Sequence, residues 1–140
     1  MTLWAVYSDR HPEVDVGGDR VGLLGLATAL FGRIPNELNL DAPPTSLQTA
    51  PSLRAIRVKP NETPNSRIRF SRDGQALTIS GRPDEMGRIL AASITQLANG
   101  PSKINTVGAH LHLDPTSDPE RSIYTPDSIS LVVQFIEPTE

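Results

Sequence analysis

The chain contains one short pattern twice: an alternating run that ends in glycine and leads into an apolar helix. Residues 14–18 (Val-Asp-Val-Gly-Gly) precede the first helix, and residues 77–81 (Leu-Thr-Ile-Ser-Gly) precede the second. The Leu-Ala pair at 26–27 corresponds to the pair at 90–91 once a single insertion is allowed. Runs with strand periodicity flank both helices, so the pattern predicts two ββαββ-like halves.

Two helices are expected. The first spans residues 20–31, and Asp19 is placed to cap it. It has no charged face, and a stripe of small residues predicts that it is buried on most sides against a very close neighbour (Gly22, Gly25, Thr28 or Ala29, and Gly32). The second begins at Pro83 and runs to about residue 98. Its expected core face consists of Met86, Ile89, Leu90, Ser93, Ile94 and Leu97.

Eight strands are expected around these helices. Arg72-Asp73-Gly74 is a hairpin signal between two of them, because glycine supplies the positive φ that such a turn needs. The fold class is therefore α+β, a mainly antiparallel sheet with two helices packed on one face. The strands are predicted at residues 3–7, 13–16, 37–40, 54–59, 67–71, 75–80, 107–113 and 129–136.

Length and composition favour one domain covering residues 1–140. The chain has no cysteine, which excludes a disulfide framework and a thiol nucleophile. The N-terminus does not resemble a signal peptide, and the longest charge-free apolar run, residues 21–32, is too short to span a bilayer. We expect a cytoplasmic protein with no membrane partner.

Charge is unevenly distributed along the chain. Residues 54–88 hold eight basic and four acidic side chains, whereas the whole chain has a net charge of −3. The alternation of the middle strands places a row of arginines on an exposed face, which could bind phosphate or nucleic acid. The acidic balance and the scarcity of aromatic residues argue against a nucleic-acid partner, so a solvated strand face is the preferred interpretation.

The sequence His110-Leu-His112-Leu-Asp114 places two imidazoles and a carboxylate on one face of a strand. These three groups could bind a transition metal, but a further strong ligand is missing. We therefore predict no bound metal and no cofactor, and interpret the residues as the wet face of a half-buried strand.

The segment from 114 to 127 is long for a connection in a compact domain, and long ordered loops often carry function. It contains the acidic residues Asp118, Glu120 and Asp127. Tyr124 in this polar surrounding is either an anchor at an interface or a lid over the edge of the sheet.

The C-terminal third resembles immunity protein family thirty-two of the bacterial polymorphic-toxin systems. The resemblance rests on the His-x-His strand, the acidic loop with Tyr124, and the following Pro-Asp-Ser…Leu-Val-Val run at 126–133. The segment 73–81 before the second helix is similar too. The resemblance implies stoichiometric binding of a cognate toxin, and it supplies no contact residues.

No phosphate-binding loop, nucleophile elbow or zinc-protease motif occurs in the sequence, so no catalytic residue is predicted. Two other classes stay open: a small metal- or anion-dependent enzyme that uses His110, His112 and Asp114, and a homodimeric structural protein that pairs through its first helix. The predicted partner-binding residues are His110, His112, Asp114, Asp118, Glu120, Tyr124 and Asp127.

Overall fold

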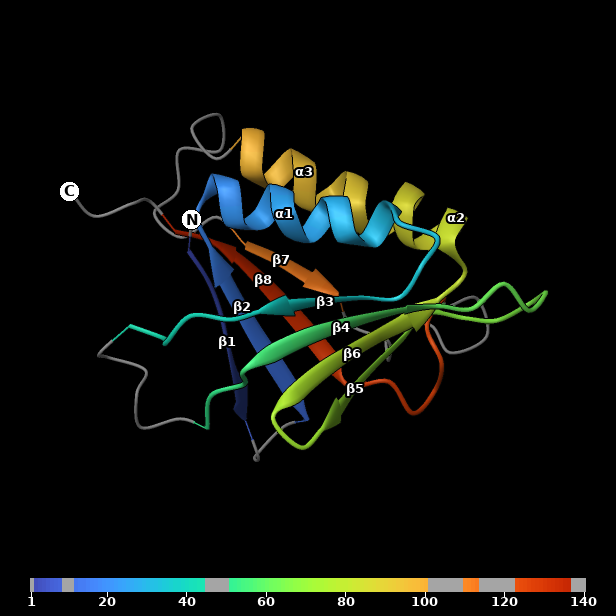
Figure 1. The fold of residues 1–140 in the computed structure, drawn as a ribbon, viewed down its shortest axis with the longest axis horizontal. Coiled ribbons are helices and arrows are strands. Elements are labelled where there is room, and N and C mark those ends of the chain that lie inside the picture. Colours follow the sequence, from blue (N-terminus) through green and yellow to red (C-terminus); the bar gives the residue numbers. More distant parts are fainter. Residues whose placement is uncertain (1, 9–11, 45–50, 101–109, 114–122, 137–140) are drawn as a thin grey trace.

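The computed structural model describes residues 2–8, 12–44, 51–100, 110–113 and 123–136 (Figure 1). Both halves of the chain have the order strand, strand, helix, strand, strand. The first half comprises β1 (Leu3–Ser8), β2 (Glu13–Gly18), α1 (Arg20–Phe31), β3 (Asn36–Asn39) and β4 (Ala55–Pro60). The second comprises β5 (Arg69–Asp73), β6 (Ala76–Gly81), a helix in three parts named α2 (Pro83–Glu85), η2 (Met86–Ala91) and α3 (Ala92–Asn99), then β7 (His110–Leu113) and β8 (Ser130–Phe135).

The two halves exchange strands to build two four-stranded sheets. The first sheet has the order β1-β2-β8-β7, and the second has the order β3-β4-β6-β5. The pairs that join the halves, β2 with β8 and β4 with β6, are parallel, and the remaining pairs are antiparallel. The α+β class and the ββαββ halves are confirmed. The strands form two sheets rather than the one expected, because local periodicity predicts strands but not their partners.

Backbone hydrogen bonds outside the strand ladders join the sheets at equivalent places. The N–H of Leu53, before β4, donates to the carbonyl of Ala5 in β1 at 2.9 Å. The N–H of Ile129, before β8, donates to the carbonyl of Phe70 in β5, also at 2.9 Å. The buried Ser128 hydroxyl accepts a further bond from the Phe70 N–H at 2.8 Å. The edges of β1 and β5 are therefore covered by the segments that lead into β4 and β8.

Helix α1 begins where the sequence predicts. The Asp19 side chain accepts a hydrogen bond from the N–H of Gly22, which confirms the predicted cap. The expected burial of the helix is only partly correct. Val21 and Phe31 are each 59% exposed, and a side chain at Gly25 would meet no atom within 4 Å. Gly22 does have a close neighbour, but that neighbour is the backbone of Thr2 and not another helix.

The second helix contains a π-helical segment, η2. A π-turn takes up one extra residue, which matches the single insertion needed to align the two halves. The extra residue also rotates the helix after it. Met86, Leu90, Ile94 and Leu97 are buried as predicted, whereas Ile89 and Ser93 are only partly buried.

The two helices lie side by side over the sheets (Figure 1). Buried residues from both sheets and both helices form one hydrophobic cluster, in which Val16, Leu26, Phe70, Leu90 and Val133 are members from different elements. The predicted hairpin is present, with Gly74 at φ 61°. No helix in the described portion of the chain is long and apolar enough to cross a membrane.

The joint at Ser128 generates a stability prediction. Replacing Ser128 by Ala leaves the Phe70 N–H without its buried acceptor and should lower the free energy of unfolding by about 1–3 kcal/mol. Replacing Ser66 by Ala removes an exposed hydroxyl that donates to the Asn61 carbonyl, and should cost less than about 0.5 kcal/mol. Urea unfolding measures both. Equal small effects would show that the Ser128 bond does not hold the sheets together.

Candidate functional site

The face of the first sheet opposite the core gathers four ionisable side chains, of which His110 and His112 are exposed, whereas Trp4, Val6 and Val132 on the same face are buried. Strand pairing places His112 beside Val132, Val132 beside Asp15, and Asp15 beside Val6, so one row crosses all four strands. Directly opposed residues share a face of a sheet. The next rows on this face contain Glu13 with Ser8 and Ser130, and His110 with Gln134, Gly17 and Trp4. We call Glu13, Asp15, His110 and His112 the acid–histidine face.

The opposite side of the same strands is apolar. Leu111, Val133, Val16 and Ala5 form one row there, and they are packed in the core. The period of two along each strand therefore turns the leucines of the His-Leu-His-Leu sequence inward and the histidines outward, as predicted. His110 and His112 are exposed, and their rings meet edge to face with centroids 4.6 Å apart.

Asp15 has the most unusual electrostatic environment of this face. Partial burial, followed by the charge of Glu13 and a hydrogen bond with it, raises the pKa of Asp15 to about 6. His112 acts in the opposite direction and favours the charged carboxylate. At neutral pH Asp15 is therefore ionised, although its surroundings favour the uncharged carboxylic acid. Carboxyl groups with raised pKa values occur preferentially at functional sites.

The acid–histidine face does not form a metal site by itself. Within the described residues, no three histidine, aspartate or glutamate side chains converge closely enough to hold an ion. The predicted group of His110, His112 and Asp114 is not tested by this finding, because Asp114 lies outside the described residues, as do Asp118 and Glu120.

Tyr124 is not the exposed anchor that the sequence suggested. It is 9% exposed, its ring packs against Phe70 with centroids 5.3 Å apart, and it forms a bridge with Ile68 at the edge of the second sheet. Burial raises the pKa of its phenol to about 12. The alternative interpretation, a lid over the sheet edge, describes its position correctly. The burial of Tyr124 was not evident from the sequence, because the residues around it are polar and its ring turns back onto the sheet.

Asp127 is exposed in the turn before β8, and its side chain lies against β5 of the second sheet. Its carboxylate pairs with the Arg69 guanidinium, Oδ2 to Nε 3.1 Å. The nearby Thr125 hydroxyl and the Arg69 charge lower the pKa of Asp127 below its ordinary value. Of the predicted partner-binding residues that the structure describes, only His110 and His112 share one exposed face.

The arginines of the middle strands have partners within the molecule. Arg57 contacts Glu37, with Nε to Oε1 2.8 Å, and the Arg72 guanidinium lies 4.0 Å from the centre of the Tyr7 ring. With the Arg69–Asp127 pair, two members of the predicted row have their charge balanced by a carboxylate, which leaves less unbalanced positive charge on this sheet.

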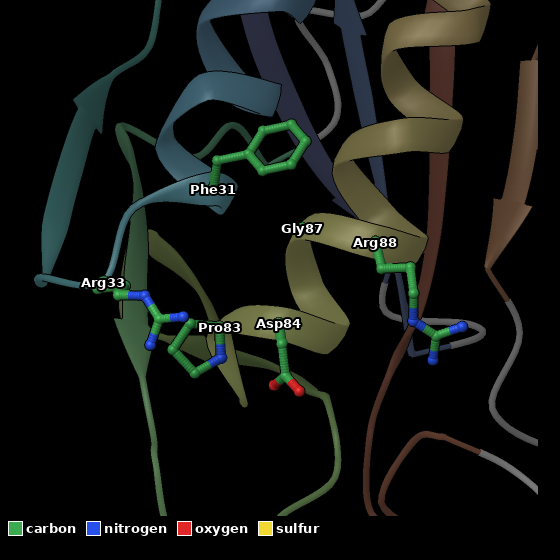
Figure 2. Close-up of a pocket in the computed structure, with 6 residues that line it drawn as sticks. All are labelled: Phe31, Arg33, Pro83, Asp84, Gly87 and Arg88. Atoms are coloured by element: carbon green, nitrogen blue, oxygen red, sulfur yellow. The ribbon is translucent and has the colours of Figure 1, made fainter.

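Sequence reasoning missed two features. Glu13 and Asp15 were assigned only to a strand, since no local signal links them to a histidine about one hundred residues later. The second is a pocket of about 300 Å³ between the end of α1 and η2 (Figure 2). It is lined by Phe31, Arg33, Pro83, Asp84, Gly87 and Arg88. The Phe31 ring lies against Gly87, where a Cβ atom would be 2.9 Å from it.

The raised pKa of Asp15 predicts a stability gain on removing its charge. A carboxyl whose folded pKa exceeds the unfolded value contributes stability below the unfolded pKa of 3.8 and loses it as pH rises through about 6. Asp15→Asn should therefore match the wild type near pH 4 and become more stable above pH 6. Because the group is partly solvated, we expect on the order of 1 kcal/mol, or about 3 °C in Tm.

Asp127→Asn is the matched control. The pKa of Asp127 is lowered in the folded protein, so its negative charge contributes stability above the ordinary pKa of 3.8. This contribution is lost as the pH falls. The variant should be less stable than the wild type at neutral pH and approach it in acid. Thermal unfolding from pH 4 to 8 compares the two. A destabilised Asp15→Asn protein at pH 7 would contradict the assignment of Asp15 as a strained carboxylate.

Comparisons of the chain with protein-family models, with curated proteins and with solved structures found no match in any of the three. The resemblance to immunity proteins of family thirty-two therefore rests on the sequence motifs alone, and the geometry of the described surfaces has to carry any argument about function.

Proposed function

We propose that this protein is an immunity protein, which neutralises a cognate bacterial toxin by binding it in a one-to-one complex through the acid–histidine face. The observation that carries the proposal is the placement of Asp15. Its charge is retained beside Glu13 on an outward face, where it lowers the stability of the free protein. A charged side chain that destabilises the folded protein, and that no structural role explains, is a candidate for function.

The chemistry of the face favours a basic partner surface. A lysine or arginine brought against Glu13 and Asp15 would relieve the repulsion between them and lower the pKa of Asp15. The exposed histidines beside this pair add ring nitrogens that can donate hydrogen bonds to a partner or accept them from it. The face is held by a four-stranded sheet, so little ordering is required on binding. A toxin that acts on nucleic acid has a basic surface of the required kind.

The test begins by asking whether a large secreted protein with a variable C-terminal domain is encoded beside this chain, and then uses that domain. Co-expression should protect cells from that domain, and the two proteins should elute as an equimolar complex. The double variant Asp15→Asn with His112→Ala should weaken the complex by roughly 10- to 100-fold. Asp73→Asn, an exposed carboxylate on the β5 hairpin, is the control and should bind as the parent does.

Asp15→Asn alone is expected to increase stability, and thermal unfolding of the double variant shows whether a loss of binding comes from unfolding. Stability and affinity should change in opposite directions. A folded double variant that binds and protects as well as the parent would rule out the acid–histidine face, and failure of the parent to bind the adjacent domain would remove the immunity function itself.

A further inference from the structure

The pocket of about 300 Å³ beside the end of α1 lies against a face of the second helix that lacks large apolar side chains (Figure 2). Pro83 and Gly87, four positions apart on that face, are both buried. The Phe31 ring closes the hollow from the side of α1, and a Cβ atom at position 87 would lie 2.9 Å from it. Any residue larger than glycine would displace this ring. Glycine is a poor helix former, so it serves the shape of the pocket and not the stability of the helix.

The π-helical segment η2 supplies Gly87 and Arg88 to the pocket. This segment contains the extra residue that distinguishes the second half of the chain from the first, and π-turns occur frequently at functional sites. At the other end of the helix pair, the corresponding place is bridged by a hydrogen bond from Arg20 Nε to Asn99 Oδ1, 3.1 Å long. The pocket is therefore specific to one half and does not follow from the repeat.

Two arginines from different elements line the pocket. Arg33 follows α1 and Arg88 belongs to η2, and Figure 2 shows them on opposite sides of Asp84. Arg88 is exposed, and it forms no ion pair with any residue that the structure describes. Arg33 contacts Glu62 at 3.3 Å, but these side chains are 74% and 68% exposed, so the pair is weak. Because a guanidinium has five N–H donors, Arg33 can bind a second carboxylate.

The acidic residue of the lining already has a partner. The Oδ2 atom of Asp84 lies 3.1 Å from the Nη2 atom of Arg82. The lining residues and their ion-pair partners comprise three arginines and two carboxylates, so their net charge at neutral pH is +1. A monoanion would balance this charge, whereas a phosphate dianion would leave excess negative charge beside Asp84. The charge of the pocket therefore favours a carboxylate.

The apolar walls favour a flat body behind that carboxylate. The Phe31 ring is 59% exposed, and with Pro83 and Gly87 it offers contact surface without a side-chain hydrogen-bonding group. A second aromatic ring packed on Phe31 adds a favourable interaction beyond the area that it buries. The volume is at the lower end of the range for small-ligand pockets, about 300–1,000 Å³.

We propose that this pocket binds a small aromatic carboxylate, with the carboxylate held by Arg33 and Arg88 and the ring packed against Phe31 and Pro83. The exposed Arg88 side chain can turn toward the bound anion without losing an ion pair to a described residue. The inference is independent of the proposed immunity function, because no residue of the pocket belongs to the acid–histidine face.

Titration with naphthoate, followed in proton–nitrogen correlation NMR spectra, tests the proposal. The amide signals of residues 84–88 should shift and reach saturation, because these residues surround the pocket. Naphthylmethanol has the same rings without the charge and should bind roughly tenfold more weakly. Naphthyl phosphate should also bind more weakly than naphthoate, because its second negative charge has no matching cation.

Single substitutions locate the site. Arg33→Gln and Arg88→Gln should each weaken naphthoate binding by roughly tenfold, and Gly87→Ala should weaken it by displacing the Phe31 ring. Arg67→Gln removes an exposed arginine outside the pocket and should bind as the parent does. Thermal unfolding checks that each variant is folded. An absence of saturable shifts at residues 84–88, equal affinity for the alcohol, tighter binding of the phosphate, or an equal loss in Arg67→Gln would overturn the proposal.

Discussion

The parallel pairing of β2 with β8, and of β4 with β6, is the constraint on which the rest of this structure depends. Each half of the chain supplies one antiparallel pair to each sheet, and an isolated two-stranded pair is marginally stable in water. The exchange turns four such pairs into two four-stranded sheets over one core. Equivalent registers in the two sheets, Val16 beside Val133 and Ile79 beside Val58, keep the apolar side chains of both on the inner face.

The same exchange creates the acid–histidine face. β8 lies between β2 and β7, and Val132 at its centre separates Asp15 from His112 by a single residue across the sheet. A fold in which each half formed its own sheet would leave these two groups apart. The electrostatic environment of Asp15 therefore depends on the strand pairing. Glu13 is close to Asp15 in the sequence, whereas His112 belongs to the other half of the chain.

Much of the fold could be predicted from the sequence, because many local signals agreed. The cap at Asp19, the turn at Gly74 and the repeated strand-glycine-helix pattern each reflect a short-range physical requirement. Apart from the hairpin at Gly74, strand partners could not be predicted, since strand periodicity shows which face of a strand is buried and not which strand lies beside it. The two glycines of β2 illustrate the limit: they were expected to end the strand, yet both remain paired with β1 and β8, and a Cβ atom at Gly17 would clash with the Trp4 indole.

The candidate site was partly predictable for the same reason. Alternation along β7 correctly turned His110 and His112 outward, whereas Glu13 and Asp15 could be joined to them only through the sheet order. The choice between the two interpretations of Tyr124 could not be made from the sequence, because its loop is polar whereas its ring packs on Phe70. The exposure of Phe31 was missed because an uncharged helix is usually a buried one.

The claim that Asp15 is retained for binding is tested most directly by counting protons during complex formation. Titration calorimetry of the chain with the adjacent toxin domain, at pH 6 in buffers of different ionisation enthalpy, gives the number of protons released. With a free-state pKa of about 6, Asp15 is half protonated there, so contact with a cation should release about 0.5 proton per complex. The Asp15→Asn protein should lose this release. A complex that forms without proton release, or releases the same number in the variant, would contradict the account.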